Sequence, residues 1–225
     1  MKQIVDQAII LRRVNYGESD RVVTALTAKC GKISLFAKGV RKPKSRLSSG
    51  IELLSLSEIY FIDGKSDLKT LTGARLLQYH DQITKNLDAT NRAFEALKKI
   101  DKISDDDAGQ EYFGTLNVYL SSLNDRRYEN DIVDAWFSMR LMKIAGVLAD
   151  ISVQPRGTTN DINYRFDFDN QFFEPHLNGI YTKDDIKLIN LLSRSAKPVV
   201  LSKPYPGNSS LITFSSQLYK GYMVH

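Results

Sequence analysis

The sequence is poor in the side chains that build metal and redox sites. It has one cysteine, Cys30, and three widely separated histidines, His80, His176 and His225. A single cysteine cannot form an internal disulfide, and a structural zinc site usually takes four Cys or His ligands. We therefore expect no structural disulfide, no metal site and no cofactor.

The phosphate-binding glycine motifs are also missing. Gly-x-Gly-x-x-Gly does not occur, and the Gly-Lys-Ser at residues 64–66 has Ile59 where the Gly-x4-Gly-Lys-Ser/Thr motif needs its first glycine. This argues against nucleotide hydrolysis. The acidic run at residues 105–107 offers carboxylates that a Mg²⁺-dependent nuclease would need. Consecutive residues at a helix start point in different directions, so helix capping explains the run better. No residue is nominated as catalytic, and we expect no enzyme.

No apolar run approaches the roughly 20 residues that cross a bilayer. The apolar residues 8–11 are too few for the core of a signal peptide. We expect a cytoplasmic protein with no membrane contact.

The chain has 225 residues, of which 42% are hydrophobic, enough for a buried core. Its formal charge of +5 is unevenly distributed. Residues 1–80 hold 14 Lys and Arg against 7 Asp and Glu, whereas residues 81–225 hold 17 against 19. The basic character belongs to the first third, which suggests two domains, 1–80 and 81–225, with different partners.

The first 80 residues have the pattern of a small barrel. Short runs rich in β-branched and apolar residues, separated by turn signals, lie at residues 7–13, 22–26, 32–37, 53–62 and 68–77. In the third run Ile33, Leu35 and Ala37 share one face by the two-residue period of a strand. Five such strands without helical periodicity predict an OB-fold barrel.

After Tyr79 the spacing becomes helical, so the predicted class is α+β, a five-stranded OB-fold barrel followed by an α-helical domain. Apolar stripes predict helices that pack into a bundle, and Thr182 is placed to cap one of them. A final helix is expected from about residue 209 toward the end. Residues 151–179 are polar and predict irregular structure or a small hairpin. The expected stripes are Phe94, Leu97, Ile100, Ile103; Phe113, Leu116, Leu120, Leu123; Val133, Trp136, Phe137, Leu141, Ile144, Leu148; and Ile186, Ile189, Leu192.

A cationic segment at residues 38–46, the basic loop, follows the third strand. Five cations in nine residues repel one another, and Gly39 and Pro43 break regular structure, so the segment should be an exposed loop. It is either an ordinary solvated loop or a track for a phosphate backbone. Tyr16, Phe36 or Tyr60 would offer a stacking surface, unless they belong to the core. The predicted DNA-binding residues are Arg12, Arg13, Arg21, Lys38, Arg41, Lys42, Lys44 and Arg46.

Four segments resemble a known family in order and spacing. They are residues 8–13 (Ala-Ile-Ile-Leu-Arg-Arg), 16–21 (Tyr-Gly-Glu-Ser-Asp-Arg), 31–33 (Gly-Lys-Ile) and 38–47, and they resemble the N-terminal signature of the bacterial DNA repair protein RecO. The resemblance implies an N-terminal OB-fold and a helical C-terminal domain. It also implies a nucleoid-associated recombination mediator that binds single- and double-stranded DNA, anneals complementary strands, helps RecR to load RecA, and binds the acidic tail of the single-stranded-DNA-binding protein SSB.

The sequence departs from the family in one place. Members often carry a four-cysteine zinc module, whose position here falls within residues 151–179, but this segment contains no cysteine. Packing by phenylalanines would have to replace the metal. The candidate residues for this replacement are Phe166, Phe168, Phe172 and Phe173.

Arg140 lies inside an apolar stripe, seven residues after Val133 and four before Ile144. It either extends to solvent or pairs with an acid such as Asp134, or it receives the carboxylates of the SSB tail. If Arg140 receives the SSB tail, the site would combine Arg140 and Lys143 with an apolar pocket of Trp136 or Leu141.

Two other functions remain open. In one, the chain is an interaction adaptor whose basic barrel contacts acidic proteins, with DNA binding incidental. In the other, less favoured, it is a metal-dependent nuclease.

Overall fold

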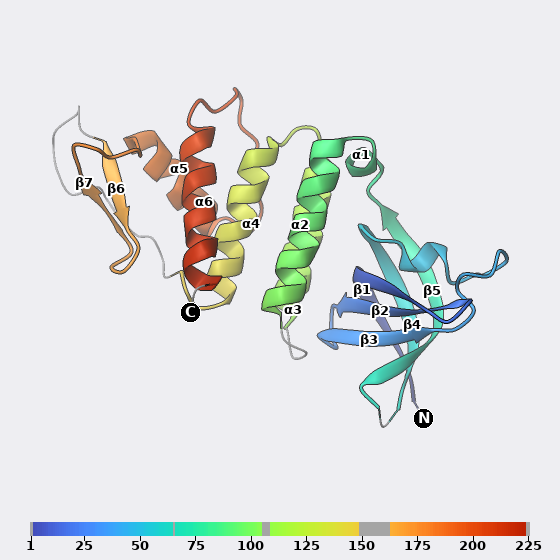
Figure 1. The fold of residues 1–225 in the computed structure, drawn as a ribbon. Helices are drawn as coiled ribbons and strands as arrows, with labels where there is room; N and C mark the ends of the chain where they lie inside the picture. Colours follow the sequence, from blue (N-terminus) through green and yellow to red (C-terminus); the bar gives the residue numbers. More distant parts are fainter. Residues whose placement is uncertain (1, 65, 105–108, 149–162, 224–225) are drawn as a thin grey trace. The chain divides into compact units, whose positions relative to one another are not determined.

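The computed structural model describes residues 2–64, 66–104, 109–148 and 163–223 (Figure 1). Its internal contacts divide the chain into two units, Met1–Asn124 and Asp125–His225, called here the first and second units. The acidic run at 105–107 lies outside the described residues.

The first unit begins with a closed five-stranded barrel. Its strands are β1 (Lys2–Tyr16), β2 (Asp20–Thr27), β3 (Lys32–Ala37), β4 (Ser55–Asp63) and β5 (Leu68–Tyr79), in the order β1-β2-β3-β5-β4. All neighbours pair antiparallel except β3 and β5, which run parallel. The predicted five-stranded OB-fold barrel is confirmed, and because the barrel closes, no strand is left with an open edge.

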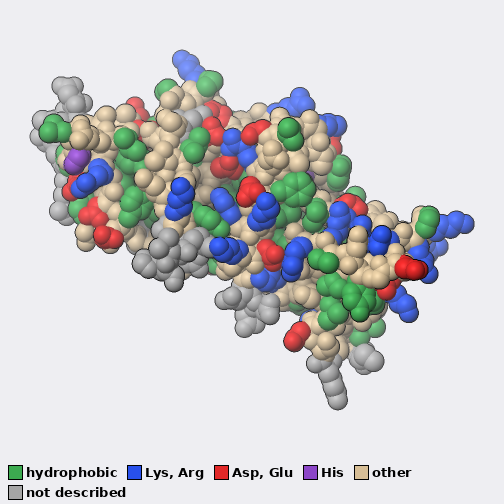
Figure 2. All heavy atoms as spheres, viewed as in Figure 1, with side chains coloured by type: hydrophobic (Ala, Val, Ile, Leu, Met, Phe, Trp, Pro, Cys, Tyr) green, Lys and Arg blue, Asp and Glu red, His purple; other side chains and the backbone are tan. Residues whose placement is uncertain are grey.

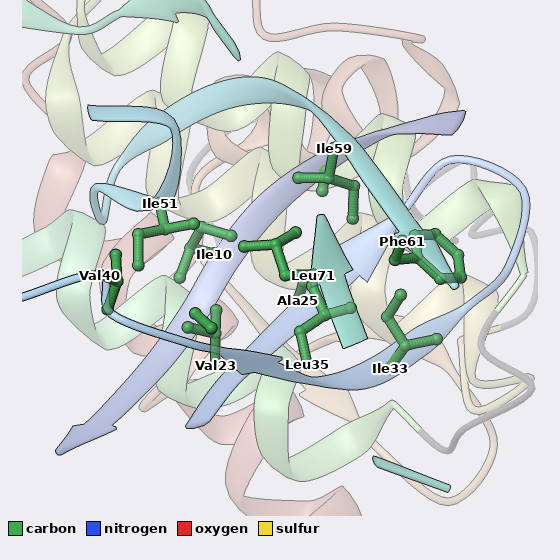
Figure 3. Packing of buried hydrophobic residues seen from close by; sticks show 12 residues of the cluster. Ile10, Val23, Ala25, Ile33, Leu35, Val40, Ile51, Ile59, Phe61 and Leu71 are labelled. Carbon is green, nitrogen blue, oxygen red and sulfur yellow. The ribbon is translucent and has the colours of Figure 1, made fainter. Parts of the chain in front are cut away.

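The barrel core follows from strand alternation. Ile33, Leu35 and Ala37 of β3 are buried, as their two-residue spacing predicts, while the residues between them are partly exposed. Figure 3 shows the side chains of the core directed toward one another between the strands. The cluster consists of Ala8, Ile10, Val23, Ala25, Ile33, Leu35, Ala37, Val40, Ile51, Ile59, Phe61 and Leu71.

A short 3-10 helix, η1 (Ser49–Ile51), precedes β4 in the chain and packs against β5. Gly50 makes this close approach possible, because a Cβ at this position would lie 2.6 Å from the backbone carbon of Ala74. Ile51 enters the barrel core from η1. The segment between the basic loop and β4 is therefore fixed to the barrel wall.

Three helices complete the first unit: α1 (Asp81–Thr84), α2 (Leu87–Ile103) and α3 (Gln110–Leu123). The Asn86 side chain caps α2 by accepting a hydrogen bond from the Ala89 amide at 3.0 Å. The change of periodicity at residue 80 marks the end of the barrel, whereas the unit boundary falls after Asn124. The second predicted stripe, on α3, is buried throughout.

Phe94 does not belong to the buried face of α2, and its predicted place in the core is wrong. Steps of three residues drift around a helix with 3.6 residues per turn, so Phe94 lies off the stripe that contains Leu97 and Ile100. Its side chain is 37% exposed. The buried face consists of Ala89, Ala93, Ala96, Leu97 and Ile100.

The end of α2 is bound to the barrel by a lysine. Lys32 of β3 donates hydrogen bonds to the carbonyl oxygen of Asp101, at 2.9 Å, and to that of Ser104. The last carbonyls of a helix lack partners within the helix and carry partial negative charge, so a cation is favoured there. Lys32 thus joins β3 to the helix end.

The second unit contains α4 (Asn130–Ile144), a hairpin of β6 (Tyr164–Asp167) and β7 (Phe172–Pro175), α5 (Lys183–Arg194) and α6 (Asn208–Met223). The predicted small hairpin is confirmed, and the remainder of that segment, residues 149–162, lies outside the described residues. Trp136 of α4 is buried, and its indole Nε1 donates to the Ser195 carbonyl oxygen at 3.0 Å. Of the predicted α4 stripe, Ile144 is only partly buried and Leu148 lies beyond the helix.

Aromatic rings hold the hairpin against α6. Phe166 contacts Phe168 and Phe173 of the hairpin, with ring centroids 4.9 and 4.7 Å apart, and Phe214 of α6 at 4.9 Å. Tyr181 packs on Phe173 at 5.4 Å. With no cysteine between residues 151 and 179, the residues present do not fit a four-cysteine zinc site.

The described part of the chain has no helix long and apolar enough to cross a membrane. It also has no group of three or more His, Cys, Asp or Glu side chains placed to hold a metal ion.

Asp185 organises the start of α5 in the second unit. Thr182 and Asp185 form the predicted N-terminal cap as a capping box, with the Thr182 amide donating to Asp185 Oδ2 at 2.7 Å. The Tyr205 hydroxyl donates to Asp185 Oδ1 at 2.8 Å. Burial, together with the negative charge of Asp185, raises the pKa of Tyr205, so this hydroxyl remains a donor at all ordinary pH values.

Replacing Tyr205 by Phe should destabilise the second unit, because the buried Asp185 carboxylate loses one donor. A hydrogen bond to a charged group contributes about 1.5–3 kcal/mol, so we expect a loss of unfolding free energy of this order. Trp136 is the only tryptophan and lies in this unit, so its fluorescence during urea unfolding measures the change.

The matched control is Tyr60→Phe in the first unit. Tyr60 also donates to a carboxylate, Glu58, at 2.5 Å, but in a pair open to solvent. This variant should leave the tryptophan-detected transition in place. An equal midpoint for Tyr205→Phe and the unmodified chain would contradict the structural role of Asp185.

Candidate nucleic-acid interface

The basic loop is exposed and yet anchored to the barrel. The side chains of Lys38, Arg41, Lys42, Lys44 and Arg46 are all exposed, as the charge pattern predicts. Between them, Val40 is buried in the barrel core, where it lies close to Ile51 in Figure 3. One apolar side chain thus fixes the start of a loop whose charges face solvent.

Hydrogen bonds tie the same loop to the β1–β2 turn. The Gly39 amide donates to Asp20 Oδ1 at 2.7 Å, and the Arg41 amide donates to the Ser19 carbonyl oxygen at 2.9 Å. Gly39 has a φ of +64°, in the left-handed region that favours glycine. Arg41 Nη1 also donates to the Gly17 carbonyl oxygen at 3.2 Å, so the loop and the turn form one surface.

The five loop cations make no ion pair with any residue that the structure describes. Figure 2 shows Lys and Arg side chains gathered at one edge of the barrel, beside a group of hydrophobic side chains on its surface. Charges that form no ion pair remain available to a polyanion.

The other three predicted cations are placed differently. Arg12 is exposed, with its Nε 3.7 Å from Asp101 Oδ2, and Arg21 Nε donates to Asn15 Oδ1 at 3.1 Å. Arg13 Nη1 lies 2.9 Å from Glu52 Oε1 and also donates to the Ile51 carbonyl oxygen at 3.3 Å. Arg13 is thus held against η1 and is the least available of the predicted set.

Two of the three candidate aromatics form a pair on the barrel surface. Tyr16 is 60% exposed and meets Phe36 edge to face, with ring centroids 5.7 Å apart and planes at 84°. Phe36 is only partly buried, and it lies two residues before Lys38 at the start of the basic loop. Tyr60 is partly buried and bonded to Glu58. The Tyr16–Phe36 pair therefore provides a ring surface next to the cations.

A pocket of about 590 Å³, the η1 pocket, was not indicated by the sequence. It lies between η1, the end of β5 and helices α1 and α2 of the first unit. Only the position of Phe94 off the buried stripe of α2 could have signalled it. Its lining residues are Arg13, Ser49, Glu52, Leu53, Leu54, Leu76, Tyr79, Thr84, Thr90 and Phe94.

A buried histidine supports the wall of this pocket. Leu54 adopts a positive φ of +62°, which is strained for a leucine. His80 Nδ1 donates to the Leu54 carbonyl oxygen at 2.6 Å, which fixes the tautomer because a carbonyl can only accept. Burial lowers the pKa of His80, and its Nε2 has no hydrogen-bond partner among the described residues.

The residues predicted to bind the SSB tail divide into two kinds. Trp136 is 1% exposed and Leu141 is fully buried, so both pack in the core of the second unit and do not line an open pocket. Arg140 and Lys143 of α4 are partly exposed. A tail site at Arg140 and Lys143 stays a prediction, without the apolar pocket expected beneath it.

Acid should weaken the first unit through His80. In the unfolded chain a histidine titrates near about 6.5, whereas burial lowers the pKa of folded His80, so below that pH the unfolded state binds more protons. The stability that depends on neutral His80 should be fully present above about pH 7 and should fall as the pH drops below about 6.5. Urea unfolding followed by circular dichroism at pH 7.5 and 5.5 measures this.

The free energy of unfolding of His80→Gln should fall less between pH 7.5 and 5.5 than that of the unmodified chain. This difference is independent of the stability of the variant at pH 7.5. His176→Gln is the control, because it removes a histidine of the second unit and leaves His80 in place. An unaltered pH dependence in His80→Gln would show that other groups cause the acid sensitivity.

Comparison with known proteins gives results consistent with this geometry. The family model described as "Recombination protein O N terminal" matches residues 1–80, the span of the barrel. The chain is similar to "DNA repair protein RecO" of Heliobacterium modesticaldum, 33% identical over 147 residues, which cover 65% of this chain and 53% of the relative. It is similar to the protein of the same name from Dehalococcoides mccartyi strain CBDB1, 33% identical over 142 residues, 62% and 55% of the two chains.

A third relative, "DNA repair protein RecO" of Halalkalibacterium halodurans, is 26% identical over 145 residues, 64% of this chain and 57% of the relative. The chain thus spans a little over half the length of the curated relatives it matches. Residues 1–80 thus match the N-terminal part of this family, and the similarity to these DNA repair proteins extends beyond the barrel to 62–65% of the chain.

Proposed function

We propose that this chain is a DNA-binding recombination mediator of DNA repair that acts without catalysis of its own. The observation that carries the proposal is the basic loop, in which five exposed cations are held to an OB-fold barrel without internal ion pairs among the described residues. The curated relatives are named as DNA repair proteins. The barrel that matches their family is the part of this chain that bears the cations.

The loop would contact phosphates, which single and double strands share. Each phosphate contact by Lys or Arg releases condensed counterions, which supplies affinity without sequence preference. Arg12 and Arg21 would extend the track along the barrel. The Tyr16–Phe36 pair would stack on bases where these are unpaired, and such stacking contributes about 1–3 kcal/mol per base.

Annealing follows from the same contacts. Two complementary strands repel each other through their phosphates, and cations that neutralise part of this charge lower the barrier to pairing. This step needs neither a nucleotide nor a metal. In line with the RecO resemblance, we propose that the chain works with RecR in loading RecA and contacts SSB through Arg140 and Lys143.

Replacing Arg41, Lys42 and Lys44 together by Ala should weaken binding to single and double strands alike, and should slow annealing. If all five loop cations contact phosphates, log K should fall with log salt at a slope of about −4.5 on duplex and about −3.5 on single strands. The three lost contacts should flatten these slopes by about 2.7 on duplex and about 2.1 on single strands. Salt titrations with labelled oligonucleotides measure both.

The control removes the same charge elsewhere, as Lys187→Ala, Arg194→Ala and Lys197→Ala in the second unit. It should keep the slopes of the unmodified chain. A folded loop variant with unchanged affinity would rule out the loop as the DNA site. Tight binding of an acidic peptide with none of DNA would instead favour the adaptor function, and metal-dependent cleavage of the oligonucleotides would favour a nuclease.

A further inference from the structure

The η1 pocket is built for a flat, partly polar group. Most of its lining is apolar, and two rings stand in its wall, Tyr79, which is 50% exposed, and Phe94. The Tyr79 hydroxyl donates to Thr84 Oγ1 at 3.3 Å, which orients its ring. A volume of about 590 Å³ lies within the range of small-ligand pockets, roughly 300–1,000 Å³.

One edge of the pocket carries both a positive and a negative side chain. Arg13 and Glu52 both line it and lie 2.9 Å apart at their closest atoms. Arg13 has more N–H groups than its contacts with Glu52 and Ile51 use, so the pair still offers donors and acceptors side by side. A nucleobase carries donors and acceptors on its edges and an apolar face, whereas an aliphatic side chain would use neither Arg13 nor Glu52.

The pocket is continuous in the chain with the basic loop. Ser49 and Glu52, which line it, follow Arg46 by three and six residues and are fixed to the barrel through η1. Phosphates attracted to the five loop cations would therefore bring their nucleotides close to the pocket. The charge of the loop selects a polyanion as the occupant's backbone.

We propose that the η1 pocket receives one unstacked base of a single DNA strand whose phosphates lie on the basic loop. The inference rests on the proposed function and adds a second contact to it. Bases of a duplex are stacked and paired, so they cannot enter without strand opening. The pocket therefore confers a preference for single strands that the loop alone does not have.

Phe94→Ala tests the proposal, with affinity measured for a 15-nucleotide thymidine oligomer and for a 15-base-pair duplex. Removing a ring on which a base stacks should weaken binding of the single strand about tenfold. Duplex affinity should stay unchanged. Leu76→Glu, a second exposed lining residue, should act in the same direction.

Leu77 provides the matched control, because it neighbours Leu76 on β5, is almost equally exposed and does not line the pocket. Leu77→Ala and Leu77→Glu should each preserve the ratio of single-strand to duplex affinity shown by the unmodified chain. The loop variant of Arg41, Lys42 and Lys44 should weaken both ligands, the duplex somewhat more than the single strand, which is the opposite of the change expected for Phe94→Ala. Thermal melts confirm that each variant is folded.

The outcomes separate the two proposals. If Phe94→Ala and Leu76→Glu keep the full affinity for single strands while the loop variant loses it, the base pocket is overturned and the proposed DNA binding stands. The pocket would then be left to an apolar side chain of a protein partner. If the unmodified chain binds neither oligonucleotide, both proposals fail.

Discussion

The hydrogen bond from the Gly39 amide to the Asp20 carboxylate is the constraint on which the proposed interface depends. Five cations in nine residues repel one another and would spread the loop into solvent. The Asp20 carboxylate at the β1–β2 turn opposes that tendency by accepting from the Gly39 amide at 2.7 Å. The next residue, Val40, is buried in the barrel core and fixes the loop a second time. The loop is thereby held beside Tyr16 and Phe36, and its charges and the two rings form one surface.

The rest of the first unit extends this principle of a rigid support for exposed charge. A closed barrel leaves no strand edge for pairing, so contacts must come from its loops and outer face. Lys32 is occupied by the carbonyls at the end of α2, and Arg13 is occupied by Glu52. These cations hold the structure together, whereas those of residues 38–46 remain available. Position in the fold, more than the number of charges, decides which cations remain available to a polyanion.

The fold was largely predictable and the details of the site were not. Alternation places Ile33, Leu35 and Ala37 in the barrel core, and the density of like charge predicts an exposed loop. Helical spacing correctly predicted a buried Trp136 but wrongly predicted a buried Phe94, and the burial of Trp136 removes it from the pocket expected for the SSB tail. Periodicity says which face of an element is apolar but not what packs against that face, so the η1 pocket and the partners of Arg13 required the structure. The tether to Asp20 joins residues 19 positions apart and left no pattern in the sequence.

The DNA affinity of Asp20→Ala tests the central claim most directly, because net charge and loop anchoring predict opposite changes in that affinity. Removing an acidic side chain makes the chain more positive, which by electrostatics alone should tighten binding to DNA. The account predicts weaker binding, since the Gly39 amide loses its acceptor and the loop cations lose their fixed position. Equal or tighter binding by a folded Asp20→Ala chain would show that the anchored loop is not what binds DNA.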